Sequence, residues 1–144
     1  MTPDAGRGVL LDTCAVIWLA DGAPMARAAL EAVTEAAMGG GVHVSPVSAW
    51  EIGLLSRPRA SAGLVFLPDP ATWFARVLTG PGIRLAPFSP EIAIAASPLP
   101  EPRHGDPADR LLIATARTMG VPIVTRDSRI VGYSSPGRLD VIAC

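Results

Sequence analysis

The chain has 144 residues, of which 49% are hydrophobic and 5% aromatic, and its 12 basic and 13 acidic side chains nearly balance. This length and aliphatic composition favour one domain with one core and argue against a second domain. All basic residues are Arg, and the absence of Lys excludes P-loop nucleotide binding and protein-kinase phosphoryl transfer, which both need a lysine. With only two cysteines, Cys14 and Cys144, we expect no disulfide framework.

The first part of the chain alternates short aliphatic runs with helical patterns. Thr13 is a candidate helix cap, and the glycines at 39–41 end a long amphipathic pattern. Ser45 followed by Pro46 predicts another helix start, because proline is favoured at the first helical position. The predicted elements are a strand over 9–12, a helix over 13–19, a helix over 24–38, a strand over 42–45 and a helix that begins at Ser45 and carries Glu51.

The second part begins with residues 57–70, which are rich in Pro, Gly and Ser and predict a surface loop. Ser89 before Pro90 is a further candidate cap, and the polar segment 99–106 predicts an irregular approach to the helix that follows. The remaining predicted elements are a helix over 69–80, a strand over 83–88, a helix over 89–97, a helix over 107–119, a strand over 122–127 and an edge strand over 139–143.

This alternation of strands and helices is typical of an α/β fold with a central, mostly parallel sheet flanked by helices on both faces. Ligands of such sheets bind outside the carboxyl ends of the strands. Asp12 and Asp127 both follow predicted strands, and Asp109 lies in the first turn of a helix, where the dipole favours an anion. The first apolar run carries Asp12 within it, so we expect neither a signal peptide nor a membrane span, and we expect a cytoplasmic protein.

Four acids, Asp12, Glu51, Asp109 and Asp127, each lie at or beside an apolar run. A carboxylate among apolar neighbours is costly unless a cation, hydrogen bonds or water compensate its charge. A set of oxygen ligands without a Cys or His cluster selects Mg²⁺ or Mn²⁺ rather than Zn²⁺. One or two such ions would suit phosphodiester cleavage, which needs no side-chain nucleophile.

Each acid also has a simpler interpretation. Asp12 could cap the helix that follows it, and Glu51 could join Ser48 in a network at its helix start. Asp109 could form a surface salt bridge or interact with the helix dipole, and Asp127 could begin a turn. The four together favour a shared site, because all of them would otherwise have to reach the same end of the sheet by accident.

Four segments carry a family resemblance: VLLDTCAVIWLA, VSAWEIGLL, HGDPADRLLIATA and PIVTRD. In this order and spacing they resemble the PIN-domain ribonucleases, most closely the VapC toxins of bacterial toxin–antitoxin systems, over almost the whole chain. The resemblance implies one PIN domain over residues 1–144 and a metal-dependent endoribonuclease. It also implies RNA as substrate, a cognate antitoxin and a homodimer. Its implied ligands of Mg²⁺ or Mn²⁺ are Asp12, Glu51, Asp109 and Asp127.

The third acid of the resemblance has two candidates. We favour Asp109, which directly precedes the RLLIATA helix as the third acid of the family does. Asp106 lies three positions earlier and remains a possible ligand, although Pro107 after it favours a capping role. His104 stands nearby in the sequence, but a lone histidine in a loop is expected to face solvent, and we assign it no catalytic role.

Other residues beside the acids are candidates for supporting roles. Thr13, Thr125 and Ser128 could orient the carboxylates or a bound water. Arg110 and Arg126 are candidates for phosphate contacts, because a guanidinium matches phosphate oxygens, and a surface salt bridge is the equal alternative for each.

Three apolar or soft side chains near the acids have a packing interpretation. Trp18 and Trp50 are expected to pack in the core rather than to stack on bases. Cys14 has no basic partner that would activate it as a nucleophile, so we expect it to be buried.

Two other functions compete with the ribonuclease. The first is a non-catalytic PIN-like module that binds RNA or protein, but such a module would be expected to have lost at least one of the acids. The second is a phosphatase or phosphoacceptor domain that uses Asp12, and the absence of Lys counts against it.

Overall fold

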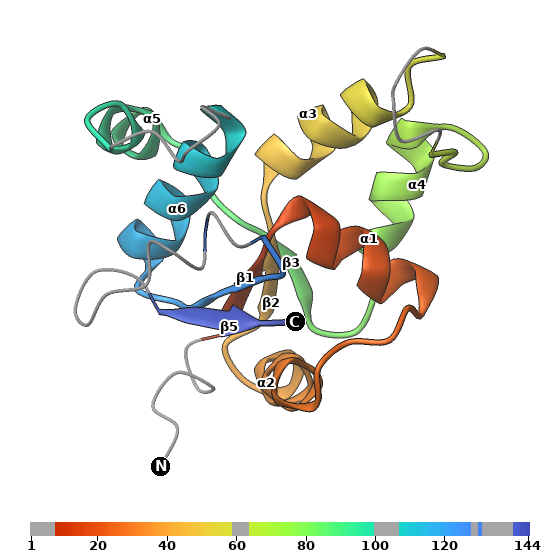
Figure 1. The fold of residues 1–144 in the computed structure, drawn as a ribbon, viewed down its shortest axis with the longest axis horizontal. Helices are drawn as coiled ribbons and strands as arrows, with labels where there is room; N and C mark the ends of the chain where they lie inside the picture. The colour runs from red at the N-terminus through yellow and green to blue at the C-terminus, as the bar shows by residue number, and fades with distance from the viewer. Residues whose placement is uncertain (1–7, 59–63, 100–106, 128–129, 131–139) are drawn as a thin grey trace.

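A five-stranded sheet organises the computed structural model, which describes residues 8–58, 64–99, 107–127, 130 and 140–144 (Figure 1). Every pair of neighbouring strands is parallel. The prediction of an α/β fold with a mostly parallel sheet is therefore confirmed. In chain order the elements are β1 (Val9–Leu11), α1 (Thr13–Asp21), α2 (Arg27–Met38), β2 (Val42–Val44), α3 (Pro46–Leu55), α4 (Pro70–Val77), β3 (Ile83–Leu85), α5 (Pro90–Ala96), α6 (Pro107–Met119), β4 (Ile123–Thr125) and β5 (Val141–Ala143).

The order of the strands creates a switch point beside β1. The sheet runs β3-β2-β1-β4-β5, so the chain first builds outward from β1 on one side and then returns to build on the other. The backbone N–H of Asp12 donates to the carbonyl of Val124 at 3.1 Å, which joins the ends of β1 and β4. In parallel sheets the crevice at such a switch point is where ligands bind.

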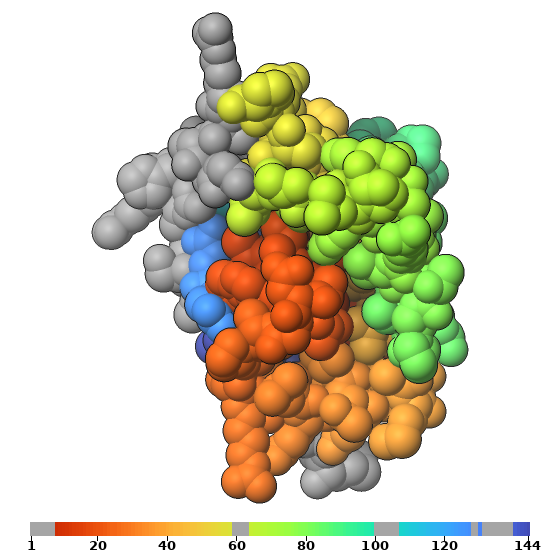
Figure 2. All heavy atoms as spheres, turned by 90° about the vertical axis from the view of Figure 1, so that its right-hand side faces the viewer, coloured from red at the N-terminus to blue at the C-terminus, as the bar shows by residue number. Residues whose placement is uncertain are grey.

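Helices cover both faces of the sheet, because residues of a strand alternate between the faces. Val9 and Leu11 belong to one apolar cluster with residues of α1, α2 and α4. Leu10 points to the other face and packs with α6, against which α5 packs in turn. Figure 2 shows α1, α2 and α4 together on one face of the molecule. Helix α3 packs against α1, α4 and α6 and lies beyond the ends of the strands (Figure 1).

Two of the predicted caps, Ser45 and Ser89, are confirmed. Ser45 accepts from the N–H of Val47 with Pro46 at the first helical position, and Ser89 accepts from the N–H of Ile92. Helix α6 keeps the predicted bounds at both ends. The described helices are all too short or too polar to cross a bilayer.

One predicted cap and one predicted helix start are wrong. Helix α1 begins at Thr13 as predicted, but its cap is Asp12, as the alternative interpretation of that acid had it, because the Asp12 carboxylate accepts from the N–H of Ala15. Helix α2 begins at Arg27 and not at Pro24. The carbonyl of Pro24 instead accepts a hydrogen bond from the side chain of Arg126 at 2.9 Å.

Candidate active site

Asp12 lies at the carboxyl end of β1 and is only 4% exposed. Its Oδ1 accepts from the N–H of Ala15 at 2.8 Å, and its Oδ2 accepts from the hydroxyl of Thr125. Burial raises the pKa of Asp12, the two hydrogen bonds lower it, and the negative charge of Asp127 raises it further. Raised on balance, this pKa shows that the carboxylate carries an uncompensated cost that a nearby cation would relieve.

Thr125 connects two of the predicted acids. This fully buried residue ends β4, and its hydroxyl donates to Asp12 while it accepts from the N–H of Asp127 at 2.9 Å. A hydroxyl has one donor and two acceptor positions, so both bonds form at once. The half-buried Asp127 is thereby held beside Asp12 at the ends of two neighbouring strands.

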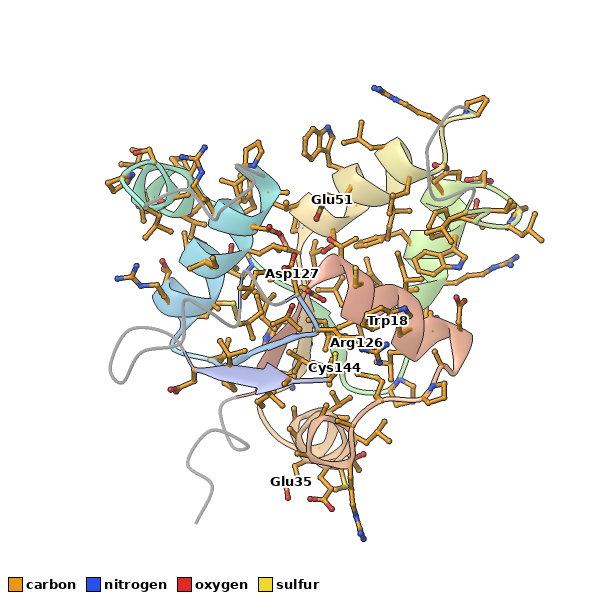
Figure 3. All side chains as sticks on the ribbon, in the orientation of Figure 1. Trp18, Glu35, Glu51, Arg126, Asp127 and Cys144 are labelled. Carbon is orange, nitrogen blue, oxygen red and sulfur yellow. The ribbon has the colours of Figure 1, made fainter. Side chains whose placement is uncertain are left out.

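Glu51 reaches the site from α3. Its Oε1 accepts from the hydroxyl of Thr13, which also lies 3.0 Å from the hydroxyl of the buried Ser48. These contacts turn the Glu51 side chain toward the first turn of α1. Figure 3 shows Glu51 on α3 and Asp127 after the end of β4, both near the start of α1.

Asp109 comes from the first turn of α6 and is 6% exposed. The N-terminal end of a helix carries a partial positive charge, which favours a carboxylate there. The alternative ligand Asp106, the loop residue His104 and Ser128, which was predicted to orient the carboxylates or a water, lie outside the described residues.

Cys14 lies near all four acids. The pKa of its thiol is raised to about 11, first because surrounding protein atoms displace part of its water and then because of the negative charges of Asp12, Glu51, Asp127 and Asp109. The charges of carboxylates at the ends of β1 and β4, on α3 and on α6 thus all act on this one thiol. The structure brings all four predicted acids to the carboxyl ends of β1 and β4, where the strand order reverses.

The environment of Cys14 also corrects a prediction. The residue was expected to be buried, but it is exposed. A thiol with this pKa is protonated at neutral pH and is a poor nucleophile. Its position in the first turn of α1, two residues after Asp12, places it on the rim of the acidic site.

A divalent cation is the group that this site implies. Within the described part of the chain, no three His, Cys, Asp or Glu side chains are already arranged as a metal cage. The donor set nevertheless fits Mg²⁺ or Mn²⁺ chemically, because these ions prefer carboxylate oxygens and keep several waters of their own. Because burial raises the pKa of Asp12, a cation bound beside it would stabilise its charged form.

The two arginine candidates differ in their surroundings. Arg110 is partly exposed and directly follows Asp109. Arg126 instead donates to the backbone carbonyls of Cys144 and Pro24, and its guanidinium lies over the ring of Trp18. These contacts occupy two of the guanidinium nitrogens of Arg126, and its predicted phosphate contact stays a prediction.

The predictions for the two tryptophans have different outcomes. Trp18 is partly buried beneath Arg126, whereas Trp50 is 56% exposed and not in the core as expected. The contact between Thr13 and Glu51 was also missed, because it joins residues 38 positions apart and has no local signal. Only the spacing of Ser48 and Glu51 hinted at that network.

The sequence and the fold both resemble those of known proteins. The sequence pattern of the PIN domain matches residues 9–134. The chain belongs to the PIN-domain family. This PIN domain is 31% identical over 130 residues to a protein named Ribonuclease VapC22 from Mycobacterium tuberculosis (strain ATCC 25618 / H37Rv). The alignment covers 89% of this chain and 93% of the relative.

Solved structures share the PIN fold with this chain. VapBC2 from Rickettsia felis, bound to a DNA fragment from their promoter, has a TM-score of 0.61 at 12% identity. DNA-bound VapBC from Salmonella typhimurium has a TM-score of 0.55 at 16% identity. In both cases the match covers 94% of this chain and 97% of the other. FitAB bound to the IR36 DNA fragment has a TM-score of 0.54 at 19% identity, with 94% of each chain covered.

Proposed function

We propose that this PIN domain is an endoribonuclease that uses Mg²⁺ or Mn²⁺ and acts as the toxin of a toxin–antitoxin pair. The observation that carries the proposal is the hydrogen bonding that holds Asp12, Asp127 and Glu51 through the hydroxyls of Thr125 and Thr13, with Asp109 near enough to act on the same Cys14 thiol as the other three. The relative named Ribonuclease VapC22 supports RNA as the substrate. An all-carboxylate site without Lys suits cleavage of a phosphodiester through metal-supplied charge.

The four carboxylates are the residues that would hold the ion. When bound, Mg²⁺ or Mn²⁺ supplies positive charge that stabilises the developing charge on the phosphate oxygens. Asp12 is the fixed ligand, because its capping bond and its bond from Thr125 hold both oxygens in place. Glu51 and Asp127 are half-buried and are the side chains we expect to rotate when the ligands gather.

The supporting hydroxyls have separate tasks. Thr125 orients Asp12 and also anchors the backbone of Asp127, so it sets the distance between two ligands. Thr13 holds Glu51 toward the same space. Hydrogen bonds of this kind raise metal affinity by fixing the ligands before the ion arrives. Arg110, beside Asp109, is the proposed phosphate contact.

The proposed partner is a cognate antitoxin, since two of the structural neighbours are VapBC complexes. Helices α1, α2 and α4 form one face of the molecule (Figure 2), on which the exposed hydrophobic side chains Leu30 and Met38 of α2 are candidate contacts for the antitoxin. We further propose that residues 1–144 form one PIN domain, that it dimerises and that it works in the cytoplasm.

Cleavage of RNA by the chain purified free of any partner tests the function. We expect total RNA to be cut when Mn²⁺ is added and to remain intact with a chelator. The Asp12→Asn variant should not cut, whereas Asp21→Asn, which removes the same charge from the exposed last residue of α1, should cut like the parent. Equal cleavage by Asp12→Asn would refute the assignment of the site. Retention of RNA without turnover at saturating Mn²⁺ would instead identify a non-catalytic binding module.

A further inference from the structure

The side chain of Arg126 makes three contacts that lead away from the acids. Its Nε donates to the carbonyl of Cys144 at 3.0 Å, and its Nη2 donates to the carbonyl of Pro24 at 2.9 Å. Its Cζ lies 3.6 Å from the centroid of the Trp18 ring, a cation–π distance. Figure 3 shows Trp18, Arg126 and Cys144 side by side. We call these three contacts the Arg126 clamp.

The clamp joins segments that carry site residues. Trp18 belongs to α1, which begins at its cap Asp12. The carbonyl of Trp18 accepts from the N–H of Ala23 at 2.9 Å, so Pro24 follows directly on the end of the same helix. The N–H of Cys144 donates to the carbonyl of Thr125 at 3.0 Å. Arg126 therefore ties α1 to the ends of both β4 and β5.

We propose that Arg126 is a positioning residue, which fixes the spacing of Asp12, Thr125 and Asp127 by holding α1 against the end of β4. Arg126 lies between Thr125 and Asp127 in the chain, so contacts that fix its side chain also restrain the backbone of both neighbours. The inference rests on the proposed function, because the spacing matters there as the spacing of metal ligands.

The shape of the guanidinium is central to this role. Two carbonyls are bound through different nitrogens while the planar face stacks on Trp18, and an ammonium group offers neither the fork nor the plane. The clamp therefore predicts that Arg126→Lys behaves like Arg126→Ala. A phosphate contact predicts the opposite, because a lysine supplies the same charge to a phosphate.

Amide hydrogen exchange tests the clamp without metal or RNA. In Arg126→Ala we expect the N–H groups of Asp12 and Asp127, which bond to Val124 and Thr125, to exchange about ten-fold faster or more. Arg117→Ala, which removes an exposed arginine from the last turn of α6, should leave these rates unchanged. Parental exchange rates in Arg126→Ala would overturn the proposal.

Direct titration with Mn²⁺ then tests the consequence for the site. In the RNA-free protein, Arg126→Ala, Arg126→Lys and Trp18→Leu should each weaken Mn²⁺ binding by about ten-fold or more. At saturating Mn²⁺, the KM for RNA should stay within about two-fold of the parent, since a clamp that does not touch RNA leaves substrate affinity alone.

Other outcomes separate the clamp from its alternatives. A raised KM with unchanged Mn²⁺ affinity, restored by Arg126→Lys, would show that Arg126 contacts RNA and would overturn the proposal. A parent protein that binds no Mn²⁺ would refute the proposed metal-dependent function, while the amide measurement would still decide the clamp. If Arg126→Ala does not fold, Arg126→Lys and Trp18→Leu carry both measurements.

Discussion

The parallel sheet has one edge where all its strands begin and an opposite edge where they all end, and the two are built from different kinds of residue. At the edge where the strands begin, glycines allow backbones to meet. A Cβ on Gly8 would lie 2.4 Å from the carbonyl oxygen of Gly41, and one on Gly82 would lie 2.4 Å from that of Ala37. Gly8 and Gly82 also have φ values of 96° and 72°, which favour glycine. This edge depends on close packing and carries none of the candidate ligands.

At the edge where the strands end, buried polar side chains hold one another. Asp12 accepts from Thr125, and Thr13 donates to Glu51 beside Ser48. Burying such groups costs free energy that hydrogen bonds only partly return. The edge where the strands begin therefore stabilises the fold, whereas the edge where they end gathers charge at a cost in stability. Substitutions at the two edges should therefore separate activity from stability.

The largest effect should follow from Asp12→Asn. Removing a proposed ligand should lower RNA cleavage by more than about 100-fold, which exceeds the loss typical of removing a residue that only orients a ligand. The free energy of unfolding without metal should stay the same or rise, because the amide removes a buried charge and still caps α1. Cleavage assays and urea unfolding measure the two quantities. A large loss of stability in this variant would contradict the division between the edges.

At the edge where the strands begin, a substitution should lower stability and leave catalysis unchanged. Gly8→Ala should lower the free energy of unfolding by about 2 kcal/mol, because alanine is strained at positive φ and its Cβ would meet Gly41. The matched control is Gly53→Ala in α3, where a Cβ meets nothing within 4 Å and alanine should stabilise by up to about 1 kcal/mol. Urea unfolding compares the two variants. The kcat of folded Gly8→Ala should equal that of the parent.

A smaller effect is expected from Thr125→Val, which keeps the shape of the side chain but removes its hydroxyl. Asp12 then loses a donor and the N–H of Asp127 loses an acceptor. Mn²⁺ affinity, measured by calorimetry, should fall by about ten-fold. Thr125→Ser restores the hydroxyl and should recover most of that affinity. Failure of the serine variant would show that the methyl group, and not the hydrogen bonds, matters.

The smallest effect is expected in how the stability of the metal-free protein depends on pH. The folded pKa of Asp12 is raised, so between its unfolded pKa and its folded pKa the folded protein holds more protons. The stability of the metal-free protein should consequently be greatest below the unfolded pKa and should fall as pH rises through the folded pKa. Urea unfolding across this range should show a shallower decline for Asp12→Asn. An identical pH dependence in both proteins would argue against the raised pKa.

Local signals explain why much of the fold could be predicted from the sequence. Pro107 and Gly120 bound α6, and Ser45 with Pro46 starts α3, so these ends depend only on neighbouring residues. The alternation of strands and helices predicted the parallel sheet, which in turn placed Asp12 and Asp127 at one edge.

The wrong predictions of burial concern helices whose hydrophobic residues are not confined to one face. Helices α1 and α3 are apolar on nearly every side, so their sequences do not indicate which side faces the core. For this reason the exposure of Cys14 and Trp50 was not predicted. The clamp role of Arg126 depends on Pro24 and Cys144, which are distant in sequence and meet only in the folded chain.

The switch point beside β1 has a consequence for the time at which the site forms during synthesis. Asp12 and its hydrogen-bond donor Thr125 are 113 residues apart, and β1 gains its second neighbour only when β4 docks beside it. A ribosome must therefore release the chain as far as Asp127 before all four acids can meet, since contacts between residues distant in sequence form late. The proposed cleavage of RNA thus depends on the last of the four acids to be synthesised, and a shorter nascent chain lacks the site.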